Sequence, residues 1–346
     1  MGPLALLAVL PALTAAYRPG ARPLGAPRSP ASPRRPPPLL MSPPPVGFIG
    51  LGIMGQGMAR RLLSANIPLV VWTRNETLAA RFQSEAAVPA AVEVASSPMA
   101  VVQACSRTYL MLPTPEACHE LYHTELGVLA GVAEGKAIID CATLRVEDME
   151  ALSEAVHRRG GLFVEAPVSG SKGPAATGQL IFMVAGDEAV YHAARPEWEA
   201  MGKTAIYCGE VGKATQLKLV VNMIMSTQLA ALAEGLALGR KLGLDGSQLQ
   251  SVLEQGAIAS PMLKLKGPLM AEANYSPNFP LKYALKDLVF ALEEARAATG
   301  LDEDDPELLP VSSAATSLYT EANENGLGDL DFAAVYETLI GHTFTE

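Results

Sequence analysis

The chain has 346 residues, which is enough for two domains of ordinary size. It carries 36 acidic and 26 basic side chains, a formal net charge of −10, so nucleic acid is not an expected partner. The four cysteines lie far apart without a C-x-x-C pair, which argues against a disulfide framework and a zinc knuckle.

The first 45 residues differ from the rest of the chain. They contain five arginines and many prolines but no Asp or Glu, and residues 4–13 are almost wholly apolar. Such a composition predicts a disordered targeting leader that is cleaved, because transit peptides are rich in Arg and poor in acids. The apolar run followed by Thr14-Ala15-Ala16 also resembles a signal peptide, and the two features in series indicate a chloroplast or plastid address. A mitochondrial address and a tail without any address are the alternatives.

A buried strand is expected at 46–49, followed at once by a glycine-rich turn and by a helix at 56–63. In this context the G-x-G-x-x-G spacing predicts dinucleotide binding, with a merely structural turn as the alternative. The first glycine allows the tight turn, the second lets a pyrophosphate approach, and the third lets the helix pack on the strand. The free N–H groups of the helix would face the phosphates. The whole turn is expected to contact the cofactor: Gly50, Leu51, Gly52, Ile53, Met54 and Gly55.

Strand and helix patterns alternate as far as Cys208. This alternation predicts an α/β Rossmann domain over 46–208, with a doubly wound, mostly parallel sheet and helices on both faces. Further strands are expected at 68–73, 108–112, 136–140, 161–166 and 180–185, and a helix at 145–159.

The pattern changes at 213–242, which is one long helical stretch without proline. It is apolar enough to suggest a membrane span, but Asn222, Gln228 and Glu234 would each be costly in lipid. We therefore predict a long interdomain helix and no membrane partner. The remaining residues show helical patterns and no evident strand, so the second domain, 209–346, is expected to be all-α.

The second strand ends in Trp72-Thr73-Arg74-Asn75, where a carboxylate would normally bind the ribose of NAD. An arginine there can pair with a 2′-phosphate, so NADP(H) is the predicted cofactor. Glu76 weakens this preference, and a solvated surface arginine is the alternative. Leu112-Pro113 and Thr143 follow later strands and could line the nicotinamide end.

Two segments carry groups suited to a substrate with a carbonyl and a carboxylate. Ser169 and Gly170 follow a strand and could hold the carboxylate, although they could equally form an ordinary turn. Lys218 and Asn222 share a helix face. An ammonium there could stabilise and protonate the oxygen that develops during hydride addition, unless the lysine reaches to the surface instead.

One motif indicates another chemistry. Residues 119–123 match the H-E-x-x-H signature of zinc peptidases, with His119 and His123 as ligands and Glu120 as base. The expected helix is short and no third ligand is evident. We therefore favour solvated histidines and expect no metal.

Apart from the H-E-x-x-H motif, the chain resembles the β-hydroxyacid dehydrogenase family from Val46 to about Phe344. Four motifs stand in the order of the family: the glycine turn, 165–170, 212–222 and Lys286-Asp287. Within the family the chain is most similar to the plant-type glyoxylate/succinic semialdehyde reductases, in stretches such as 169–172, 219–225, 279–282 and 326–332.

The resemblance implies roles for individual residues. Lys218 would be the catalytic lysine. Plant members tend to carry a lysine where this chain has Leu78, so the preference for NADPH is expected to be less strict, with Arg81 as a candidate replacement. Substrate contacts are implied for Thr143, Ser169, Gly170, Asn222, Phe279 and Asp287. Besides the glycine turn, the expected cofactor contacts are Thr73, Arg74, Asn75, Leu112, Pro113, Thr143 and Lys286.

By resemblance, the chain is an NADPH-dependent reductase of small aldehydes that bear a carboxylate, taking glyoxylate to glycolate and succinic semialdehyde to 4-hydroxybutyrate. Three alternatives stay open: an NAD-dependent 3-hydroxyisobutyrate dehydrogenase, a zinc peptidase, and a nucleotide-binding module without catalysis. Relatives assemble through their helical domains, so a homodimer or homotetramer is implied.

Overall fold

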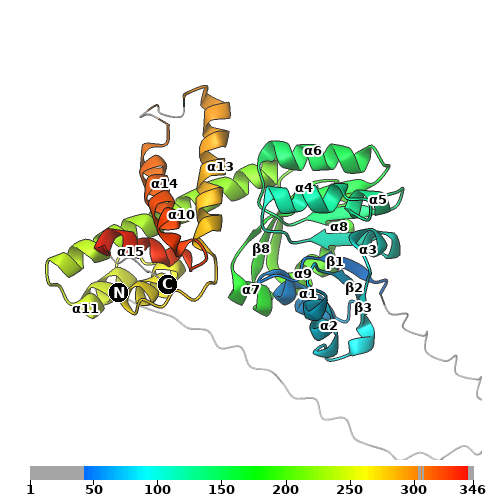
Figure 1. Cartoon of the computed structure of the whole chain (residues 1–346), viewed down its shortest axis with the longest axis horizontal. Helices are drawn as coiled ribbons and strands as arrows, with labels where there is room; N and C mark the ends of the chain where they lie inside the picture. Colours follow the sequence, from blue (N-terminus) through cyan, green and yellow to red (C-terminus); the bar gives the residue numbers. More distant parts are fainter. Residues whose placement is uncertain (1–42, 303–304, 306–307, 342–346) are drawn as a thin grey trace, which may run out of the picture. The chain divides into compact units, whose positions relative to one another are not determined.

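The computed structural model describes residues 43–302, 305 and 308–341. The predicted targeting leader lies outside the described residues except for 43–45. The described chain begins with a sheet covered by helices and continues with helices alone (Figure 1).

Six parallel strands form the main part of the sheet, in the order β3-β2-β1-β4-β5-β6. They are β1 (Val46–Ile49), β2 (Leu69–Trp72), β3 (Val92–Val94), β4 (Arg107–Leu110), β5 (Ala137–Asp140) and β6 (Leu162–Glu165). The sheet continues through β8 (Leu180–Gly186), which runs antiparallel to β6 and pairs with both β7 (Val168–Ser169) and β9 (Gly202–Tyr207). The Rossmann prediction, with its mostly parallel sheet, is therefore confirmed.

Helices cover both faces of this sheet, because successive side chains of a strand point to opposite faces. Phe48 of β1 lies in a core cluster with α1 and α9, whereas its neighbour Ile49 lies in a second cluster with α3, α4 and α6. The helices of this part are α1 (Gly55–Ser64), α2 (Glu76–Ser84), α3 (Pro98–Ala104), α4 (Pro115–His123), α5 (Val128–Gly131), α6 (Val146–His157), α7 (Lys172–Thr177), α8 (Glu188–Ala193) and α9 (Arg195–Met201), with the short turn η1 (Pro89–Ala91).

The second part is helical, as predicted. In the described residues its only β-type pairing is an isolated bridge between Pro280 and Asp331. Its elements are α10 (Lys213–Lys241), α11 (Gly246–Gln255), α12 (Pro261–Ala271), α13 (Leu281–Thr299), α14 (Pro310–Ala322), η2 (Asn323–Leu327), η3 (Phe332–Ala334) and α15 (Val335–Ile340).

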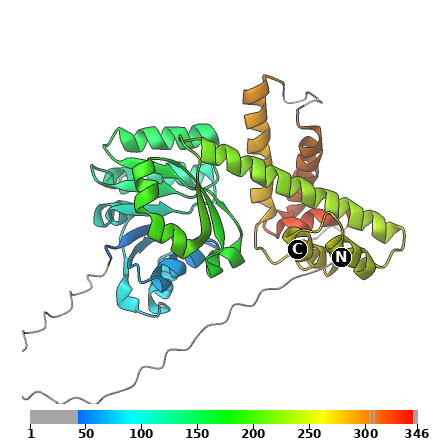
Figure 2. The ribbon, with the colours of Figure 1, turned by 180° about the vertical axis from the view of Figure 1, so that it is seen from behind.

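The helix α10 is continuous over its whole length (Figure 2). It contacts β8 near its start and packs against α13, α14 and α15 further on. By length and composition it could cross a membrane, a test that the core helix of a soluble protein also passes. Lys218 and Asn222 are buried in its packed surface, which agrees with the predicted interdomain helix. The division of the chain near Cys208 stays a prediction.

Candidate functional site

The three glycines of the turn between β1 and α1 differ in the space around them. Gly50 has a φ of 99°, and a Cβ there would lie 2.4 Å from the carbonyl oxygen of Met111. A Cβ at Gly55 would lie 1.9 Å from the carbonyl oxygen of Gly50. At Gly52, in contrast, a Cβ would meet no atom within 4 Å. No side chain caps the start of α1, so this turn fits the phosphates of a dinucleotide.

A cavity of about 330 Å³ opens beside this turn. Its walls come from the carboxyl edge of the parallel sheet and from α10 and α13 of the helical part. Most of the residues predicted for the site line it together: Gly52, Ile53, Met54, Gly55, Leu112, Pro113, Thr143, Gly170, Lys218, Asn222, Phe279, Lys286 and Asp287.

The other predicted residues do not line this cavity. Gly50 and Leu51 form the inner part of the turn, and Leu51 is fully buried. Thr73, Arg74 and Asn75 follow β2, and half-buried Ser169 ends β7. The roles assigned to these residues stay predictions.

Sequence reasoning missed several lining residues, and for most of them a signal was present. Tyr283 lies three and four residues before Lys286 and Asp287, so it shares their face of α13. The others are direct neighbours of predicted residues or strand ends. The missed residues are Met111, Val168, Ser171, Asn278, Pro280 and Tyr283.

A chain of polar contacts runs from Lys218 across the cavity wall. The Nζ of Lys218 donates to Oδ1 of Asn222 at 2.8 Å, and Nδ2 of Asn222 donates to Oδ2 of Asp287 at 2.6 Å. The other oxygen of Asp287 forms an ion pair with Lys286 at 2.9 Å, and Lys286 donates to the carbonyl oxygen of Thr143. The contacts thereby connect α10, α13 and the loop after β5.

The amine of Lys218 lies in a largely dry environment, since the residue is only 6% exposed. Burial lowers its pKa to about 8; the carboxylate of Asp287 opposes this shift and the nearby ammonium of Lys286 adds to it. An amine with such a pKa can both hold and release a proton near neutral pH.

Glu165, at the end of β6, fixes the start of α10. Its Oε1 accepts the backbone N–H groups of Gly212 and Ala214 at 2.9 Å and of Thr215 at 3.3 Å. Its Oε2 accepts the hydroxyl of Thr215 at 2.5 Å. This carboxylate therefore satisfies the helix donors that no residue of α10 itself caps. Lys218 lies one turn further on, so Glu165 holds the turn from which the amine projects.

A second buried carboxylate, Asp331, fixes the wall around Phe279. Its Oδ2 accepts the N–H groups of Asn278 at 3.0 Å and Phe279 at 3.3 Å, while Oδ1 forms an ion pair with Lys266 at 2.7 Å. The ring of Phe279 packs edge-on against Phe332, with centroids 5.4 Å apart. The loop that presents Phe279 to the cavity is thus held by buried partners.

The predicted 2′-phosphate ligands lie at the start of α2. Asn75 is the N-cap of this helix, and its Oδ1 accepts the N–H of Leu78 at 2.9 Å. Arg74 is exposed, and its Nη2 lies 3.6 Å from Oε2 of Glu120.

The H-E-x-x-H motif forms part of α4. The rings of His119 and His123 stack with centroids 4.4 Å apart, and Nδ1 of His123 lies 2.9 Å from the carbonyl oxygen of His119. Over the described ranges, no group of three or more His, Cys, Asp or Glu side chains could hold a metal ion. The zinc alternative therefore has no further ligand among these residues.

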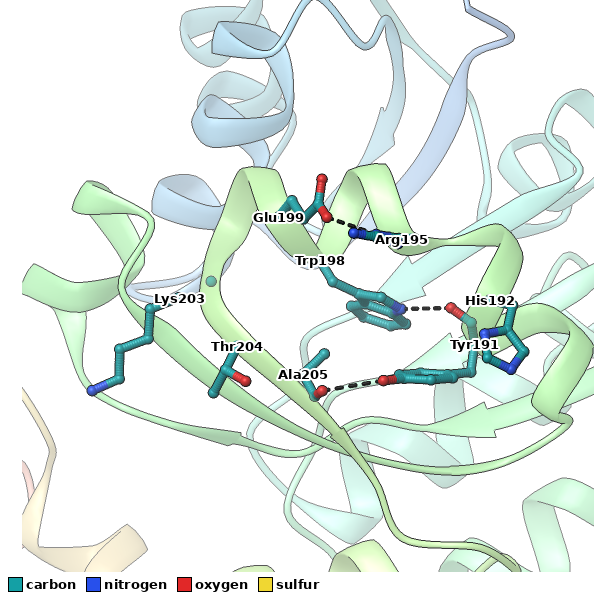
Figure 3. Close-up of a pocket in the computed structure, with 9 residues that line it drawn as sticks. Tyr191, His192, Arg195, Trp198, Glu199, Lys203, Thr204 and Ala205 are labelled. Carbon is teal, nitrogen blue, oxygen red and sulfur yellow. Dashed lines mark hydrogen bonds and ion pairs between the residues drawn. The ribbon is translucent and has the colours of Figure 1, made fainter.

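A second hollow, of about 410 Å³, lies between α8, α9 and β9 (Figure 3). Three polar contacts connect residues drawn there. The indole N–H of Trp198 donates to the carbonyl oxygen of Tyr191, and the hydroxyl of Tyr191 donates to the carbonyl oxygen of Ala205. Arg195 forms an ion pair with Glu199 at 2.7 Å. No predicted site residue lines this hollow, so we place the functional site beside the glycine turn.

Two protein families match the chain. The family described as the NAD binding domain of 6-phosphogluconate dehydrogenase matches residues 45–209. The family described as NAD-binding of NADP-dependent 3-hydroxyisobutyrate dehydrogenase matches residues 212–339.

Among known proteins, two reductases of Arabidopsis thaliana are similar to this chain. Glyoxylate/succinic semialdehyde reductase 2, chloroplastic, is 42% identical over 294 residues, which are 85% of this chain and 79% of that protein. Glyoxylate/succinic semialdehyde reductase 1 is 41% identical over 85% of this chain and 98% of its own length. The human cytokine-like nuclear factor N-PAC is 34% identical, but the match spans only 51% of it.

Solved structures agree with these relatives. The 3-hydroxyisobutyrate dehydrogenase of Mycobacterium tuberculosis with L-serine is 31% identical, with a TM-score of 0.71 over 85% of this chain and 98% of that one. Psf3 in complex with NADP+ and 2-OPP is 28% identical, with a TM-score of 0.76 over 85% and 99%.

The Rossmann domain, the cavity and these relatives define an oxidoreductase that acts on CH–OH groups of small molecules and uses a nicotinamide dinucleotide. Within that class, the chain belongs to the β-hydroxyacid dehydrogenase family. The resemblance read from the sequence motifs is therefore confirmed.

Proposed function

We propose that this protein is an NADPH-dependent reductase of small aldehydes that bear a carboxylate. Its substrates would be glyoxylate, reduced to glycolate, and succinic semialdehyde, reduced to 4-hydroxybutyrate. The names of the two Arabidopsis relatives support this substrate class. The observation that carries the proposal is the buried amine of Lys218, which lines the same cavity as the glycine turn.

In the proposed mechanism, bound NADPH supplies the hydride for the aldehyde carbon. Lys218 stabilises the carbonyl oxygen as negative charge develops on it and then donates the proton that completes the alcohol. Asn222 accepts from the amine and thereby orients it toward the cavity. Asp287, bonded to the amide of Asn222, favours the charged form of the lysine.

Three further residues would position the substrate. Ser169 and Gly170 would hold the carboxylate through the hydroxyl and the backbone N–H. Phe279, whose ring is held by Phe332, would exclude water from one side of the cavity. Positioning of this kind lowers the entropic part of the barrier.

A substrate screen tests the proposal. We expect purified protein lacking residues 1–45 to show its highest kcat/KM with glyoxylate or succinic semialdehyde and NADPH. Steady-state rates should be compared for both aldehydes and for 3-hydroxyisobutyrate, each with both cofactors. A higher kcat/KM for 3-hydroxyisobutyrate with NAD would show instead that the chain is a dehydrogenase of that hydroxy acid.

The pH dependence of the reaction follows from the state of Lys218. Because reduction consumes the protonated amine, we expect kcat for aldehyde reduction to fall as the pH rises through about 8. Alcohol oxidation needs the neutral amine as base, so its rate should rise through the same pH. Both directions can be followed by nicotinamide absorbance. A reduction rate that stays constant from about pH 7 to about pH 10 would contradict the proton-donor role.

We also propose that the protein forms a homodimer or homotetramer through its helical part. A stripe of apolar side chains on α10 is exposed, among them Leu217, Val220, Ile224, Leu238 and Leu242. A large exposed apolar surface of this kind is typical of an interface.

A charge within such an interface should prevent assembly. We expect Leu238→Glu to reduce the mass measured by light scattering to that of a smaller assembly. Leu126→Glu is the matched control, because Leu126 is exposed to a similar extent, 54% against 58%, but lies outside the helical part. An unchanged mass of the Leu238→Glu variant would place the interface elsewhere.

The cell compartment is a separate proposal. We propose a plastid address for residues 1–45, since one Arabidopsis relative is named chloroplastic, although the other is not. Fluorescence microscopy of a reporter fused to these residues tests this, and mitochondrial import would contradict it.

A further inference from the structure

Arg74 carries the charge that would bind the 2′-phosphate of NADPH, but it already has a partner. The Nη2 of Arg74 lies 3.6 Å from Oε2 of Glu120 on α4, and both side chains are open to solvent, 76% and 65% exposed. In the described residues, Glu120 is the only carboxylate within 4.0 Å of this guanidinium. Glu120 belongs to the H-E-x-x-H motif, for which the proposed reaction has no use.

Of two nearby positions, one carries no charge and the other carries a cation that also has a carboxylate partner. Leu78, in the first turn of α2, is half-buried and packs against the core cluster beneath the helix. Arg81, the candidate replacement, lies 3.7 Å from Glu85 at the other end of α2. Arg74 directly follows β2, so a 2′-phosphate at the end of this strand would depend mainly on its guanidinium.

We propose that Glu120 is a specificity-determining residue that weakens the preference of this protein for NADP(H) over NAD(H). The inference rests on the proposed function, in which Arg74 binds the 2′-phosphate. Glu120 acts in two ways: it competes with the phosphate for the guanidinium, and its own negative charge repels the phosphate. NAD(H) carries no phosphate at this position, so neither effect applies to it.

Comparing the binding of NADP+ with that of NAD+ tests the proposal. An effect of Glu120 on the 2′-phosphate changes only NADP+ binding, whereas a general change in the site alters the binding of both cofactors. The dissociation constants of NADP+ and NAD+ should be measured by calorimetry at one fixed pH. We expect Glu120→Gln to tighten NADP+ binding by about two- to fivefold, in the range of solvent-exposed charge pairs, and to leave the dissociation constant of NAD+ unchanged. The gain should shrink as the ionic strength is raised, because salt screens exposed charges.

Two further variants make each outcome decisive. Glu125→Gln removes one negative charge just beyond the end of α4 and should leave the ratio of the two dissociation constants unchanged. Arg74→Ala tests the underlying cofactor site and should weaken NADP+ binding but not NAD+ binding. If Arg74→Ala lowers the preference and Glu120→Gln leaves it unchanged, the role of Glu120 is wrong while the cofactor site stands. If Arg74→Ala also leaves the ratio unchanged, the proposed 2′-phosphate site is wrong as well.

Discussion

Replacement of Lys218 by methionine should abolish turnover while leaving NADPH binding intact. Methionine has a similar length and no charge, so it fills the buried space without an ammonium. The reaction then loses both the proton donor and the charge that stabilises the developing alkoxide, and we expect kcat to fall by about a thousandfold or more. Because the glycine turn and the end of β2 are untouched, the dissociation constant of NADPH should change by less than about twofold.

Single-turnover kinetics and fluorescence of bound NADPH measure the two effects separately. Lys213→Met is the matched control, because Lys213 lies at the start of the same helix, is exposed and does not line the cavity. Full activity in the Lys218 variant would refute the catalytic role. Loss of NADPH binding together with activity would mean that the substitution disturbs the whole site.

Replacement of Glu165 by leucine should have the largest effect on stability. Leucine leaves three N–H groups and the hydroxyl of Thr215 without their acceptor in a buried place. Each such loss costs about 1–3 kcal/mol, so we expect the free energy of unfolding to fall by about 4 kcal/mol or more. Glu165→Gln keeps one oxygen for the N–H groups, so this variant should lose less than half as much.

Milder variants show whether this carboxylate also positions the amine. Thr215→Val removes the hydroxyl that contacts Glu165 and keeps the shape, whereas Thr215→Ser keeps the hydroxyl. We expect the valine variant to lower kcat by about tenfold with NADPH affinity unchanged, and the serine variant to retain most of the rate. Urea unfolding and steady-state rates give both quantities. Equal kcat values in the two variants would limit Glu165 to a structural role.

Much of the fold was predictable because buried parallel strands are short apolar runs between helical patterns. The strands β1, β2, β4, β5, β6 and β8 all have this character. The strand β9 does not, since Lys203 and Thr204 are exposed and break the apolar pattern. The strands β3 and β7 have three residues and two residues, too few for a period to be recognised. Pairing with neighbouring strands, rather than local sequence, determines whether such short segments form strands.

The site was predictable where its residues are close in sequence. Lys218 and Asn222 could be paired because four residues make one turn of a helix. Asp287 lies 65 residues beyond Asn222, and only the packing of α13 against α10 brings them together, so the family resemblance was needed to name it. The capping of α10 by Glu165 was also not predicted, because the N–H groups that Glu165 accepts lie 47 to 50 residues further along the chain.

The length of α10 separates the two roles proposed for it, one in catalysis and one in subunit contact. Lys218 is the sixth residue of this helix and Leu238 lies twenty residues later. At a rise of 1.5 Å per residue, the two are about 30 Å apart along the axis. A substitution at the far end cannot touch the amine or its hydrogen-bonded neighbours. Substitutions at the proposed subunit interface can therefore accumulate while the proposed chemistry at Lys218 is inherited unaltered.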